Sequence, residues 1–172
     1  EEEICVRLAT FDGEEMEVNC ELPGGKRHEN ELPTQAVKRI MAEKLSPICA
    51  GVQLQHAEHK IEYKLSEQYN VNTKYMITTF QAHMLESFTW PDLPKPACGD
   101  VVTKTFSLVA PPQLPLVDEC FFLPNGNKKS LFAWVSPGMF DYLTTANGKK
   151  ALEAWCSSVN FEFESPSSAA AQ

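Results

Sequence analysis

Cysteine and histidine are the residue types in this chain with the greatest potential for chemistry. Six cysteines occur at wide and irregular intervals: Cys5, Cys20, Cys49, Cys98, Cys120 and Cys156. A cysteine nucleophile needs a histidine base and an orienting group close to it in space. Cys98 stands beside Gly99-Asp100, and His83 precedes it by fifteen positions. Such a pair is expected by chance, so we predict that the protein is not an enzyme. A cysteine-dependent enzyme or enzyme accessory, with chemistry at Cys98 or Cys120, is the alternative.

The spacing of these residues does not favour a metal or redox site. No Cys-x-x-Cys pair is present, which removes the usual zinc and disulfide-exchange signatures. His56 and His59 bracket Ala57-Glu58, but on a strand this spacing does not turn both imidazoles to one side. We therefore predict surface histidines, no metal, no cofactor, and reduced structural thiols in the cytoplasm or another reducing compartment. A cleaved targeting peptide is compatible with this prediction.

Aromatic residues are dense in the second half of the chain. The set consists of Phe121, Phe122, Phe132, Trp134, Phe140, Tyr142 and Trp155. The simplest interpretation is the core of a domain. The alternative is that one strand face stays exposed and binds protein, because tryptophan and arginine are enriched at binding hot spots. The candidate protein-binding residues are Trp134, Phe121, Phe132 and, in the first half, Arg7.

Composition limits the class of partner. The 172 residues carry a net charge of -8, of which -5 lies in residues 1–80 and -3 in residues 81–172. Neither half has the basic surface that nucleic acid requires, so nucleic acid is not an expected partner. The uncharged stretch of residues 106–117 is too short and too rich in proline to span a bilayer. The expected partners are other proteins.

The first eighty residues predict a hairpin, a helix and two further strands. Strand-forming residues 4–11 and 15–22 flank Asp12-Gly13, a strong hairpin signal. A helix is predicted from Pro33 or Thr34 to Pro47, with its buried face formed by Val37, Ile40, Met41 and Leu45. Strand patterns follow at 51–55 and 75–80, with a short turn element at 65–71 between them. A helix across a mixed sheet would bury one face of each element.

This order of elements resembles the ubiquitin-like β-grasp family over residues 4–80. The Leu-Ser-Glu-Gln-Tyr-Asn-Val sequence at 65–71 is similar to the turn before that family's last strand, where Leu and Ile or Val plug the core. The chain continues past Phe80 instead of ending in Gly-Gly, so the resemblance implies a domain that binds proteins without being conjugated. It also implies an outer-face binding patch, which here would carry Gln53 and Gln55 in place of apolar residues.

The remaining sequence predicts a second, smaller domain. We divide the chain into a ubiquitin-like domain (1–82), a Pro-rich connector (83–100), a small α+β domain (101–164) and a flexible tail (165–172). The α+β domain is expected to contain a strand at 101–109 and a hairpin of 119–123 with 130–135 around Asn125-Gly126. A helix from Ser136-Pro137 should end or break at Asn147-Gly148, followed by a helical turn at 149–156 and a strand at 159–164.

These features together predict a non-enzymatic adaptor or subunit of a larger protein assembly. A third possibility is a Ras-association-like β-grasp that binds small GTPases by strand addition. That function would favour a basic edge strand, for which Arg7 is the available residue.

Overall fold

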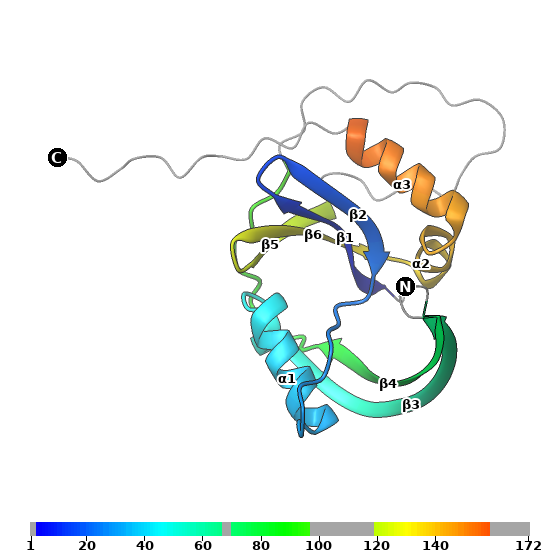
Figure 1. The fold of residues 1–172 in the computed structure, drawn as a ribbon. Coiled ribbons are helices and arrows are strands. Elements are labelled where there is room, and N and C mark those ends of the chain that lie inside the picture. Colours follow the sequence, from blue (N-terminus) through cyan, green and yellow to red (C-terminus); the bar gives the residue numbers. More distant parts are fainter. Residues whose placement is uncertain (1–2, 67–69, 97–118, 159–172) are drawn as a thin grey trace.

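The computed structural model describes residues 3–66, 70–96 and 119–158, and Figure 1 shows their arrangement. These residues form a mixed α and β structure with two antiparallel sheets, as the α+β prediction requires. The predicted strands at 101–109 and 159–164 and the tail at 165–172 lie outside the described residues.

The larger sheet is built from two short hairpins. Strands β1 (Ile4–Asp12) and β2 (Glu15–Glu21) form the first, and β5 (Cys120–Asn125) and β6 (Lys128–Val135) form the second. Both turns contain a glycine with positive φ, +61° at Gly13 and +62° at Gly126. Glycine adopts this conformation without the steric cost that a side chain imposes. Both predicted hairpins are therefore confirmed.

The two hairpins lie side by side in the strand order β2-β1-β6-β5. Strand β1 pairs antiparallel with β6 from Ile4 opposite Val135 to Phe11 opposite Lys129, with a bulge between Arg7 and Ala9. The first strand of the predicted domain 1–82 therefore shares a sheet and both core clusters with residues after 119.

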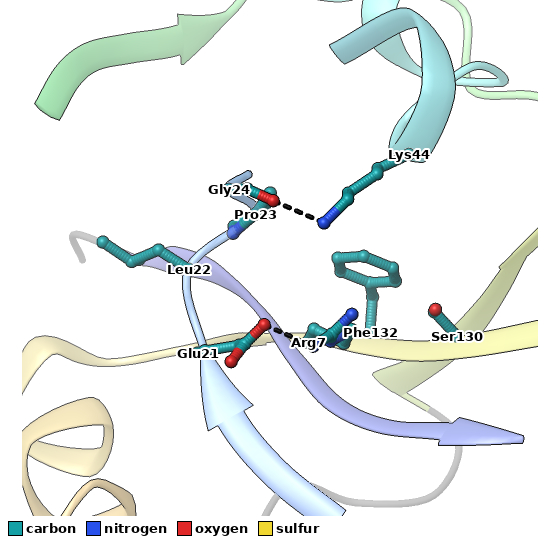
Figure 2. A pocket seen from close by; sticks show the side chains of 8 residues that line it. All are labelled: Arg7, Glu21, Leu22, Pro23, Gly24, Lys44, Ser130 and Phe132. Atoms are coloured by element: carbon teal, nitrogen blue, oxygen red, sulfur yellow. Dashed lines mark hydrogen bonds and ion pairs between the residues drawn. The ribbon is translucent and has the colours of Figure 1, made fainter. Parts of the chain in front are cut away.

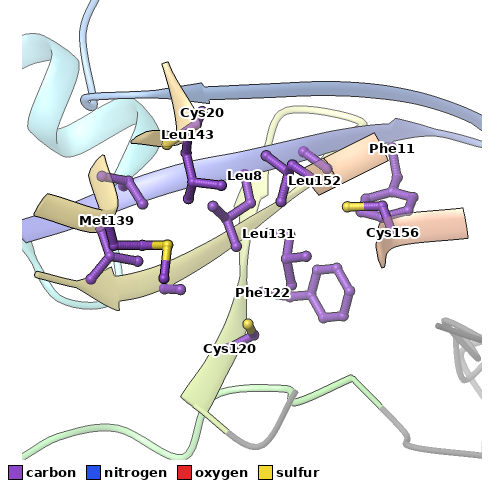
Figure 3. Close-up of a cluster of buried hydrophobic side chains, with 14 residues drawn as sticks. Leu8, Phe11, Cys20, Cys120, Phe122, Leu131, Met139, Leu143, Leu152 and Cys156 are labelled. Carbon is purple, nitrogen blue, oxygen red and sulfur yellow. The ribbon is translucent and has the colours of Figure 1, made fainter. Parts of the chain in front are cut away.

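Side chains alternate between the two faces of this sheet, and each face has its own core. One face packs against α2 (Pro137–Leu143) and α3 (Ala146–Ser158). Figure 3 shows this cluster, which brings together Leu8, Phe122, Leu131, Met139, Leu143 and Leu152. The opposite face carries Phe121, Leu123 and Phe132, which pack with Leu45 and Ile48 just after α1 (Pro33–Lys44).

Helix α2 begins as predicted and the predicted helical turn at 149–156 is part of α3, whereas the predicted helix end at Asn147-Gly148 is wrong. The Ser136 hydroxyl accepts a hydrogen bond from the Met139 amide at 3.2 Å, which caps α2. Asn147 and Gly148 do not end a helix but lie in the first turn of α3. A Cβ at position 148 would lie 2.0 Å from the carbonyl oxygen of Tyr142. Glycine is therefore required there by the close approach of the two helices.

The segment predicted as a Pro-rich connector packs on the sheet over the part that is described. Phe88 and Leu93 join the second core cluster, and Phe88 covers Gly51. The amide of Phe122 donates a hydrogen bond to the carbonyl of Pro94 at 2.8 Å. Residues 85–96 are thus a strap against β5 and not a free spacer.

The second sheet is a long hairpin of β3 (Val52–Ser66) and β4 (Val71–Met84). In Figure 1 it curves away beside the four-stranded sheet. The two strands pair with each other and not with β1 or β2, so the predicted mixed sheet is not formed by the described residues.

The turn element predicted at 65–71 lies at the tip of this hairpin. Leu65 is 59% exposed and Val71 is 53% exposed. Neither residue plugs a core as the resemblance implies, and a ubiquitin-like β-grasp is not confirmed.

Candidate functional site

The four predicted binding residues do not form one exposed patch. Phe121 and Phe132 stack with ring centroids 6.1 Å apart, and Phe132 is only 1% exposed. For these two residues the core interpretation is correct. Trp134 is half-buried at the margin of the same cluster, where its ring meets Trp90 edge to face at 6.0 Å.

Trp90 extends this aromatic cluster to the surface, and the sequence analysis missed it. Its ring also contacts Phe88 at 5.7 Å and Phe121 at 6.3 Å. Trp90 was assigned to a connector because prolines surround it, although the alternation of Phe88 and Trp90 is a signal of a packed segment.

A groove of about 660 Å³ lies where this aromatic cluster meets the base of the β3/β4 hairpin. Its lining residues are Glu3, Gln55, Gln81, Ala82, His83, Met84, Trp90 and Trp134. The groove is wide and open, and its walls combine two indole rings with amide and imidazole groups. It is suited to an extended chain with mixed side chains more than to a small apolar ligand.

Arg7 lies on β1 and is paired within the sheet. Its guanidinium forms an ion pair with Glu21 on the neighbouring strand β2. Figure 2 shows this pair beside Phe132, with Lys44 donating a hydrogen bond to the carbonyl of Gly24 nearby. The cavity between these groups has a volume of about 10 Å³, which is room for one water molecule at most. The Lys44 hydrogen bond thus ties the end of α1 to the loop that follows β2.

Among the described cysteines, Cys5, Cys120 and Cys156 have a thiol whose pKa is raised. Burial raises the pKa of Cys5 and of Cys156 to about 12. The pKa of Cys120 is also raised to about 12, by burial first and then by Cys156 and Glu119. A thiolate is the reactive form, so a raised pKa disfavours nucleophilic chemistry at Cys120. Cys98 lies outside the described residues.

The two central histidines lie on β3 and have separate neighbours. His59 Nδ1 lies 3.0 Å from the Thr78 hydroxyl, and His56 Nε2 lies 3.8 Å from a Glu58 carboxylate oxygen. Within the described ranges no group of three or more histidine, cysteine or acidic side chains is arranged to hold a metal ion. In the same ranges, no helix combines the length and the hydropathy needed to cross a membrane.

The most exposed apolar surface belongs to the outer part of the β3/β4 hairpin, which we call the arm (residues 57–66 and 71–80). No described residue of the arm is buried. Ile61 is 55% exposed, Tyr63 71% and Met76 69%. Alternation along β3 places Ile61, Tyr63 and Leu65 on one face, and Met76 opposite Ile61 joins them there.

The other face of β3 carries a row of charges with alternating sign. Glu58, Lys60, Glu62 and Lys64 follow one another at every second position. Lys60 and Lys64 each lie 2.7 Å from a carboxylate oxygen of Glu62. Hydrogen bonds from Lys60 and then Lys64 lower the pKa of Glu62 to about 2. Thus β3 has an apolar face and an ionic face, and both are in contact with solvent.

Comparison with known proteins finds no matching family model, no similar curated protein and no similar solved structure.

Proposed function

We propose that this chain is a non-enzymatic subunit of a protein assembly and that the arm is its contact surface. The observation that carries the proposal is the exposed apolar face formed by Ile61, Tyr63, Leu65 and Met76, which no other described residue buries. The ubiquitin-like β-grasp suggested by residues 4–80 is not confirmed, and the proposal does not depend on it.

Physical chemistry explains why such a face favours a partner. A two-stranded hairpin on its own is marginally stable in water, and it gains stability when another surface covers its apolar side. Exposed apolar patches rimmed by polar residues are typical of protein contact sites. Here Lys74 and Asn72, opposite Tyr63 and Leu65, supply part of that polar rim. A partner that covers the face would remove several large side chains from water in a single contact.

The groove beside Trp90 and Trp134 supports the same class of function. It is lined by residues at the base of the hairpin, next to the arm, together with two indole rings. Tryptophan contributes large binding energies when a partner buries it.

The proposal is tested by purifying tagged protein from its native source with a matched pair of variants. Tyr63→Ser combined with Met76→Ser changes the apolar face of the arm. Leu32→Ser changes a residue of similar exposure, 60%, at the start of α1. We expect the arm variant to lose the co-purifying protein and the Leu32 variant to retain it, with both variants folded by circular dichroism. Equal recovery with both variants would contradict the proposal.

A further inference from the structure

The outer edge of β3 has the properties of a strand that pairs with another strand. Among the described residues β3 has a single strand neighbour, β4, so its opposite edge has no backbone partner there. Such an edge presents a row of N–H and C=O groups to any strand that can lie beside it. The side chains along this edge determine which strand fits.

The charge sequence of β3 is complementary to itself in the antiparallel direction. If two copies pair about a two-fold axis through Ile61, Lys60 of each copy faces Glu62 of the other, and Glu58 faces Lys64. In this register each of the four charged side chains of one copy lies opposite a side chain of the other sign in the second copy. These side chains share one face, and opposed residues of an antiparallel pair lie close enough to interact.

Neighbouring registers lose this complementarity. With the axis at Lys60, lysine faces lysine and Glu58 faces Glu62. With the axis at Glu62, glutamate faces glutamate and Lys60 faces Lys64. Axes at residues 59 or 63 keep two of the four opposite-sign pairs. Like charges directly opposed are destabilising, so the row selects one register.

The same register is favourable on the apolar face. Ile61 meets Ile61, Tyr63 meets His59, and Leu65 meets Ala57 across the two-fold axis. Charged residues on an edge strand often serve to prevent pairing. A strand with charges of one sign would repel a second copy in every register. The alternating charges of β3 instead favour pairing in the register centred on Ile61 and disfavour the neighbouring registers.

We infer that β3 is a homodimerisation edge, on which a second copy of this chain adds its own β3 antiparallel, centred on Ile61. The inference rests on the proposed function and specifies one partner for the arm. The result is a four-stranded sheet in the order β4-β3-β3-β4, in which two apolar faces become one continuous surface. Edge pairing leaves that surface available for a further protein of the assembly.

The charge row provides a complementation test. Glu62→Lys places lysine opposite Lys60, and Lys60→Glu places glutamate opposite Glu62, so each variant alone should be a monomer of 19.3 kDa. Wild type, and an equimolar mixture of the two variants, should give a species of twice that mass by light scattering, because the mixture restores all four pairs. A monomeric wild type, or a dimer that neither substitution weakens, would overturn the inference.

The register is tested by disulfide trapping. Opposed residues in an antiparallel pair have Cα atoms about 4.5 to 5.5 Å apart, within the range that a disulfide spans. Ile61→Cys should therefore give a covalent dimer under mild oxidation. In Tyr63→Cys the two new cysteines would lie four residues apart along the strands, roughly 13 Å, and should not cross-link. Equal cross-linking at both positions would overturn the register.

Failure of this inference is distinguishable from failure of the proposed function. A monomeric wild type that still loses its co-purifying protein on Tyr63→Ser and Met76→Ser overturns only the second-copy assignment. The opposite result is a wild-type dimer that Glu62→Lys and Lys60→Glu each disrupt, together with a co-purifying protein that the Tyr63→Ser, Met76→Ser variant retains. That result would support the β3 edge and contradict the apolar face as a contact surface.

Discussion

Leu65→Ala tests whether the arm is exposed as the structure describes or plugs a core as the family resemblance implies. Burying a leucine side chain fully contributes about 1.5 to 3 kcal/mol. Leu65 is 59% exposed, so less than half of its surface leaves water on folding. We expect Leu65→Ala to lower the free energy of unfolding by about 1 kcal/mol or less.

Leu131→Ala is the matched control, because Leu131 is also a strand leucine but is 0% exposed in the core beneath α2 and α3. Deleting a buried leucine leaves a cavity and costs about 3 to 5 kcal/mol. Both substitutions are measured by urea unfolding in a Lys60→Glu background, so that self-association does not contribute. If Leu65→Ala costs as much as Leu131→Ala, Leu65 is a core residue and our description of the arm is wrong.

Three further predictions follow from the packing. A fragment of residues 1–86 should give a collapsed amide spectrum by NMR, because it lacks the β6 partner of β1, and a dispersed spectrum would show that the first half folds alone. Gly148→Ala should destabilise the protein by about 1 to 3 kcal/mol, because the new methyl group overlaps the Tyr142 carbonyl. Gly138→Ala is the control and should not destabilise the protein in this way, because the space around Gly138 is open. Equal unfolding midpoints for the two variants would contradict the close approach of α2 and α3. Because burial raises the thiol pKa of Cys120 and Cys156 to about 12, the folded state keeps protons that the unfolded state releases from about pH 9. The free energy of unfolding should therefore fall as the pH rises from 9 to about 12. Replacing both cysteines by alanine should make this fall less steep, and an unchanged pH dependence would contradict the raised pKa values.

Local structure was predictable where local chemistry determines it. Asp12-Gly13 and Asn125-Gly126 both form the predicted hairpin turns, because the backbone there needs a positive φ that glycine tolerates. The Ser136-Pro137 helix start was also predictable, since a hydroxyl cap and a proline in the first turn act within a few residues.

Pairing between distant segments was not predictable from the same patterns. The alternation of β1 and of β6 shows that each strand has a buried face, but not that they are neighbours across more than one hundred residues. The Asn147-Gly148 signal was misread for a related reason: glycine near a helix end usually marks a stop, and the close contact that requires it here comes from another helix.

The candidate site was only partly predictable. Phe132 and Trp134 lie on the same face of β6 and in the same cluster, so neither composition nor alternation could separate the buried Phe132 from the half-buried Trp134 at its margin. The signal of the arm was present in the sequence. Glu58, Lys60, Glu62 and Lys64 alternate with His59, Ile61 and Tyr63 over the length of a strand, although 56–64 was not assigned as a strand.

Amide hydrogen exchange along the arm at increasing protein concentration is the most direct test of the arm as a contact surface with β3 as its pairing edge. Unpaired edge amides exchange quickly, and amides in a backbone hydrogen bond between strands are protected. We predict that protection of alternate residues of β3 around Ile61 increases with concentration in the wild type but not in Glu62→Lys, while the outer edge of β4 stays unprotected. Protection that is independent of concentration, or that appears on β4 instead, would contradict the account.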